Sequence, residues 1–94
     1  MTNNIMTIEE LKEKIKGMDY DKAVTELDAY IAAHPDEEEA YTLRGMRHWG
    51  AGKRSLAIND YLAAIRINPA SRAREALNAA NEILDYRNTD LYNP

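Results

Sequence analysis

Two prolines 34 residues apart punctuate the chain and bound the segment Pro35–Pro69, PDEEEAYTLRGMRHWGAGKRSLAINDYLAAIRINP. A fixed period of this length is typical of repeated helix pairs. Shifting the chain by the same offset aligns apolar or small residues with one another: Ala23 with Ala57, Leu27 with Tyr61, Ile31 with Ile65, Leu43 with Leu77 and Gly45 with Ala79. The sequence therefore contains an internal repeat of low identity.

Each part of the repeat has the apolar spacing of a helix. In residues 20–33 the apolar side chains recur at intervals of three and four, and residues 55–67 show the same pattern with a broader stripe that includes Leu56 and Leu62. No segment shows the alternation of a half-buried strand. The sequence predicts an all-α fold of five helices near residues 7–16, 19–33, 36–49, 53–67 and 70–87, with an irregular tail over 88–94.

Capping residues support these helix starts. Thr7 and Glu10 have the spacing of a capping box, in which each side chain bonds the backbone amide of the other residue. Asp36 and Glu39 repeat this spacing, and Ser71 is suited to cap the last helix. Connections of two to four residues predict that successive helices lie antiparallel to one another.

Composition narrows the class of protein. The chain has 94 residues, which suits a single domain, and its lack of cysteine excludes disulfides, thiolate zinc sites and a cysteine nucleophile. Its 12 Lys and Arg residues against 16 Asp and Glu residues give a net charge of -4, which disfavours nucleic-acid binding. No apolar run is long enough to span a membrane, and we expect a cytoplasmic protein.

The arrangement resembles the tetratricopeptide repeat family, whose unit is an antiparallel helix pair. The residues that match the family pattern are an aromatic, a glycine, two alanines, a second aromatic and a proline: Tyr41, Gly45, Ala57, Ala64, Tyr61 and Pro69. The resemblance covers residues 7–87. It divides one domain, 1–94, into a disordered N-terminus (1–6), repeat 1 (7–35), repeat 2 (36–69), a capping helix (70–87) and a tail (88–94).

The resemblance implies a module that binds a protein or peptide in an apolar concave groove and performs no chemistry. Carried over by position, the groove residues are Leu43, Met46 and Trp49, which are the central anchors, and Leu77, Ala80, Ile83 and Leu84. The family's clamp for a ligand carboxylate is missing at the matching positions, where only Lys12 is basic. Arg44 and Arg47 are expected to orient an acidic flank of the ligand.

The sequence leaves two further candidates for the occupant of the groove. An exposed apolar strip of this size is unusual for a monomer, so a second copy of the chain in a homodimer is the main alternative. The chain's own tail is another, through Tyr86, Leu91 and Tyr92 docking on the last helices.

The distribution of charge suggests a further alternative. Acidic residues dominate residues 1–39, whereas residues 40–74 are rich in Arg and contain one acid, Asp60. We expect neighbouring repeats to pair these charges. Head-to-tail association of copies, or phosphate or nucleic-acid binding through the Arg-rich middle, is a less favoured interpretation.

No catalytic, metal or cofactor-binding residues are predicted. His34 and His48 lack further ligands at metal-site spacing, and the glycines lie at turn and helix-packing positions without a preceding strand. Ser55 and Ser71 have no histidine nearby on the same helical turn. The sequence therefore predicts a protein without enzymatic activity or cofactors.

Overall fold

The computed structural model describes the backbone of residues 6–92 and the side chains of residues 6–82, and this part of the chain is helical without strands. The helices are α1 (Ile8–Ile15), α2 (Tyr20–Ala33), α3 (Glu38–Gly50), α4 (Arg54–Ile67) and α5 (Ala73–Tyr92). The predicted all-α fold of five helices is thus confirmed over the described residues. Within that range, none of the helices combines the length and apolarity needed to cross a membrane.

Side-chain caps fix the starts of α1 and α2. The Glu10 amide donates to the Thr7 hydroxyl at 3.1 Å and the Thr7 amide donates to the Glu10 carboxylate at 2.9 Å, which confirms the predicted capping box. At α2, the Lys22 amide donates to the carboxylate of Asp19 at 3.0 Å. This second cap was not predicted from the sequence.

The start of α3 differs from the prediction. The helix begins at Glu38, and Glu37 before it makes no side-chain capping bond, so the capping box predicted at Asp36 is wrong. The residues after Pro35 instead form a turn in which the Glu37 amide donates to the His34 carbonyl at 3.1 Å. Before α5, the Ala73 amide donates to the Ser71 hydroxyl at 3.1 Å, so Ser71 does satisfy an amide at that helix start.

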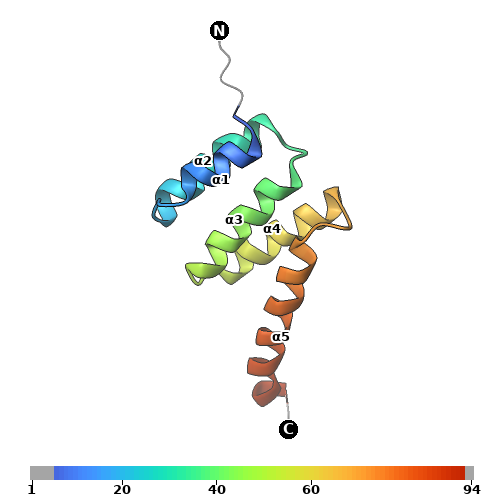
Figure 1. Ribbon diagram of the computed structural model, residues 1–94. Coiled ribbons are helices and arrows are strands. Elements are labelled where there is room, and N and C mark those ends of the chain that lie inside the picture. The colour runs from blue at the N-terminus through green and yellow to red at the C-terminus, as the bar shows by residue number, and fades with distance from the viewer. Residues whose placement is uncertain (1–5, 93–94) are drawn as a thin grey trace.

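Helix α3 occupies the centre of the chain's arrangement. In Figure 1, α1 lies along α2, α3 lies along α4, and α5 leads away from the end of α4. Helix α3 contacts α2 and α4, whereas α5 contacts α4 and, to a smaller extent, α3. Each helix therefore packs mainly against its neighbours in the sequence.

Two separate apolar clusters hold these helices together. The α1–α2 cluster consists of buried Leu11, Ile15, Ala23 and Leu27, and Leu43 of α3 packs against it. The α4–α5 cluster consists of buried Ala57, Tyr61, Ala64 and Ala73, with Tyr41 and Trp49 of α3 packed on it. Helix α3 thus contributes side chains to both clusters. The buried face of α4 is narrower than its apolar stripe, since Leu56 and Leu62 are exposed.

The closest packing between α3 and α4 is at Gly45. A Cβ atom at this position would lie 2.7 Å from Cε1 of Tyr61 and 3.2 Å from the carbonyl oxygen of Ala57. Tyr61 is only 3% exposed, so its ring has little room to move away. Glycine is therefore required here by the close approach of the two helices.

Helix α5 is longer than predicted. It extends to Tyr92, so the irregular tail expected from residue 88 is wrong as far as the backbone is described. Residues 73–92 contain neither glycine nor proline, and the weak helix formers Asn88, Thr89 and Asp90 do not end the helix. The predicted docking of Tyr86, Leu91 and Tyr92 lies outside the described side chains.

Candidate functional site

An apolar pocket opens between α3 and α5. It has a volume of about 280 Å³ and is lined by Met46, Trp49 and Gly50 of α3, Tyr61 of α4, and Ala76, Ala79 and Ala80 of α5. Among the residues whose side chains are described, no lining side chain carries a charge. The pocket forms because α5 presents three alanines toward the larger side chains of α3 and α4, which leaves space between the helices.

Met46 and Trp49 differ in the fraction of their surface that is exposed to a ligand. Met46 is 45% exposed. Trp49 is partly buried because it packs against the α4–α5 cluster. The Arg54 guanidinium lies 5.1 Å from the centre of the Trp49 ring, a cation–π contact. Trp49 therefore belongs both to the pocket wall and to the packing of α3 on α4.

The predicted groove residues separate into three groups. Met46, Trp49 and Ala80 line the pocket. Leu43 and Leu77 are partly buried and pack instead against the α1–α2 cluster and the α4–α5 cluster, respectively. The side chains of Ile83 and Leu84 lie outside the described residues.

Four lining residues were not predicted: Gly50, Tyr61, Ala76 and Ala79. Shifting the sequence by 34 residues aligns Ala79 with Gly45, and this alignment indicates a small residue on a helix-packing face. Gly45 allows close packing because α4 covers it, whereas the matching face of α5 at Ala79 is exposed. A small residue therefore allows close packing at Gly45 but leaves open space at Ala79.

Arg44 and Arg47 do not line the pocket, because both guanidinium groups are bonded within the chain. Arg44 donates to both carboxylate oxygens of Asp60, at 2.9 Å and 2.8 Å, and to Asp28 at 2.9 Å. Arg47 donates to the carbonyl oxygens of Met18 and Ile15 at 2.8 Å and 2.7 Å. These bonds hold α3 to α4 and to the α1–α2 region, and they engage the guanidinium groups that were expected to orient a ligand.

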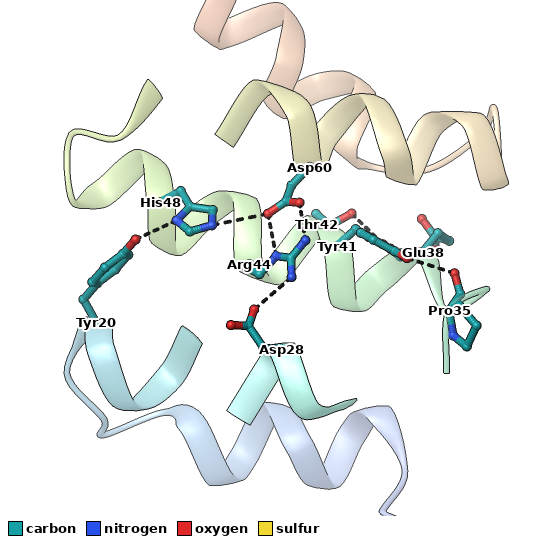
Figure 2. A network of polar contacts seen from close by, with 9 residues as sticks. All are labelled: Tyr20, Asp28, Pro35, Glu38, Tyr41, Thr42, Arg44, His48 and Asp60. Carbon is teal, nitrogen blue, oxygen red and sulfur yellow. Dashed lines mark hydrogen bonds and ion pairs between the residues drawn. The ribbon is translucent and has the colours of Figure 1, made fainter. Parts of the chain in front are cut away.

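Figure 2 shows the polar network that contains Arg44 and Asp60. The Tyr20 hydroxyl lies 2.8 Å from Nδ1 of His48, and Nε2 of His48 lies 3.6 Å from Asp60. The network joins α2, α3 and α4. Bonding to Asp60, aided by Asp28 and opposed by burial, raises the pKa of Arg44 above its already high value. Burial lowers the pKa of His48 despite the attraction of Asp60.

Several charges of the acidic and basic regions pair within the chain. Lys12 of α1 lies 2.8 Å from Glu39 of α3, and Arg72 lies 3.4 Å from the same carboxylate oxygen. With the Arg44–Asp28 pair, these contacts agree with the expectation that neighbouring repeats pair their charges. Each exposed pair contributes little to stability, about 1 kcal/mol or less.

The described residues contain no group of three or more histidine, aspartate or glutamate side chains suited to hold a metal ion. A search of protein-family models gave no match to the chain. Searches of curated proteins and of solved structures gave no significant match either.

Proposed function

We propose that the chain is a tetratricopeptide-type module that binds an apolar segment of a partner protein in the pocket between α3 and α5, without chemistry. The observation that carries this proposal is the pocket, whose described lining is uncharged and includes the exposed residue Met46. Exposed apolar surface gathered in a concave site is typical of binding sites.

The repeat interpretation has support from the packing. The 34-residue offset relates α2 to α4. In the packing of α3 on α4, Gly45 lies against Tyr61, where a tetratricopeptide pattern expects a small residue against a large one. Helix α5 follows α4 as α3 follows α2 and contacts both α4 and α3. These features favour a helix-pair array in which α5 is a first helix without a second.

The lining indicates the chemistry of the ligand. An uncharged pocket of this size suits one or two large apolar side chains, such as those on one face of an amphipathic helix. The guanidinium of Arg54 lies on the ring of the lining residue Trp49. A charged chain end has no partner among the lining residues that the structure describes, so an apolar anchor is the favoured ligand.

Ala79→Arg tests this proposal, and we expect it to weaken partner binding by about tenfold or more. Ala79 is exposed, so arginine fits on α5 without disturbing buried packing, and we expect its long charged side chain to obstruct the pocket. The matched control is Ala32→Arg, the same change at an exposed position of α2 outside the pocket. The measurement is affinity capture with wild type and both variants, followed by titration of the recovered partner.

Retention of the partner by the Ala79 variant, or equal loss from both variants, would contradict the proposal. Measuring the molar mass by light scattering over a hundredfold concentration range tests the homodimer alternative. A dimer that Ala79→Arg dissociates would place a second copy of the chain in the pocket. That result would replace the partner proposal by self-association.

A further inference from the structure

Helix α5 repeats the surface of α3 without the helix that covers it. In the 34-residue repeat, Ala79 of α5 aligns with Gly45 of α3. Helix α4 packs closely on Gly45 through the ring of Tyr61 and the backbone of Ala57. Ala79, by contrast, is exposed and lines the pocket. Among the described residues, no helix therefore covers Ala79 in the way that α4 covers Gly45.

The course of α5 explains why this surface is bare. Helix α3 ends at Gly50, and residues 51–53 make the turn that leads back along it as α4. The aligned residues 85–87 make no turn, because α5 continues as a helix to Tyr92. In Figure 1, α5 accordingly leads away from the other helices instead of being followed by a returning one. A helix that covers Ala79 does not come from the described part of the chain.

The two aligned surfaces differ in charge. On α3, Arg44 and His48 face α4, which supplies the carboxylate of Asp60 at 2.8 Å from Arg44 and 3.6 Å from His48. The aligned positions on α5 hold neutral Asn78 and anionic Glu82, and both side chains are exposed. A helix that covers α5 in the same manner therefore needs a cation at the position where α4 has an aspartate.

We propose that the partner segment is a basic amphipathic helix that packs on α5 as α4 packs on α3, an inference that rests on the function proposed above. An aromatic side chain of this helix lies on Ala79 and enters the pocket, as the Tyr61 ring lies on Gly45. A lysine or arginine directly before the aromatic residue pairs with Glu82. Affinity comes from the apolar anchor, and the acidic rim of the pocket selects a helix with basic flanks.

The probe for this proposal is a synthetic peptide with the sequence of α4, residues 54–67, acetylated and amidated at its ends. It is prepared in its natural form and with Asp60→Lys. Calorimetric titration of the full chain gives both affinities, and the fluorescence of Trp49, the single tryptophan, reports entry into the pocket. We expect the Asp60→Lys peptide to bind about tenfold more tightly, because its lysine meets Glu82. Adding Tyr61→Ala to that peptide is expected to weaken binding by about tenfold or more.

Glu82→Lys in the chain tests the same contact from the other side. Glu82 is exposed, so lysine fits there without repacking. We expect this variant to reverse the order of affinities, so that the natural peptide binds more tightly than the Asp60→Lys peptide. The matched control is Glu13→Lys on α1, where the glutamate side chain is 74% exposed and lies outside the pocket. It makes the same change of charge and is expected to keep the wild-type order.

Equal affinity of the two peptides, or an order that Glu82→Lys does not reverse, overturns the proposal. Binding that Ala79→Arg leaves unchanged also overturns it, because the peptide then lies outside the pocket. The absence of binding by either peptide overturns the basic helix but not the pocket, which the partner-capture experiment with Ala79→Arg tests separately. A dimer of the chain that excludes both peptides would place a second copy on α5 and overturn the proposal as well.

Discussion

Gly45→Val is expected to lower the free energy of unfolding by about 3 kcal/mol, a large part of the stability of a domain this small. The first added carbon lies 2.7 Å from Cε1 of Tyr61 and 3.2 Å from the Ala57 carbonyl oxygen. The tyrosine ring is buried, and the carbonyl belongs to the backbone of α4, so neither gives way easily. Urea denaturation followed by circular dichroism measures the effect.

Gly50→Val is the matched control, because it makes the same change on the same helix. A Cβ at Gly50 would meet no described atom from another part of the chain within 4 Å, so we expect a change in the free energy of unfolding within about 0.5 kcal/mol. Tyr61→Leu removes the ring atoms that clash, so the Gly45→Val change is expected to cost less in that background than in the wild type. Equal stability of the two glycine variants would show that α3 and α4 are not packed as closely as described.

Asp60→Ala is expected to lower the free energy of unfolding by about 3 kcal/mol. Asp60 is 5% exposed and accepts two bonds from Arg44, so its removal leaves a partly buried guanidinium with Asp28 alone. His48 also loses the carboxylate that faces Nε2. The midpoint of urea denaturation near neutral pH checks this result.

Asp28→Ala is the control for Asp60→Ala, since the Asp28 side chain is 57% exposed and bonds the same arginine. We expect it to cost about 1 kcal/mol or less. Replacing both members of the buried pair, Arg44→Met with Asp60→Leu, is expected to be more stable than Asp60→Ala alone, because no charge is left buried without its partner. If Asp28→Ala and Asp60→Ala lowered the free energy of unfolding by similar amounts, the buried Arg44–Asp60 pair would not contribute more to stability than the exposed Arg44–Asp28 pair.

The helices were predictable because local signals determine them. The capping box at Thr7 places the start of α1, and the repeat offset relates α4 to α2. Asp36 misled the prediction of α3 because an acidic residue after proline suits a turn as well as a cap. The end of α5 was missed because weak helix formers do not by themselves end a helix.

The site was less predictable because it depends on how helices are rotated against one another. The resemblance to the repeat family placed Leu43 on the same surface as Met46, but a resemblance in sequence cannot tell that Leu43 packs on the α1–α2 cluster while Met46 stays exposed. The bonds of Arg44 join residues 16 positions away on either side, beyond any local pattern. The sequence did contain one indication that Asp60 has a structural role, since it is the only acid among residues 40–74 and lies in an apolar stretch.

The packing of each helix on its neighbours in the sequence has a kinetic consequence. Contacts between adjacent helices need only short loops to close, so little chain entropy is lost before the first contacts form. Chains with such local contacts fold within about microseconds to milliseconds. Folding can begin at the α3–α4 hairpin and spread in both directions, so a partly folded chain exposes its terminal helices only briefly.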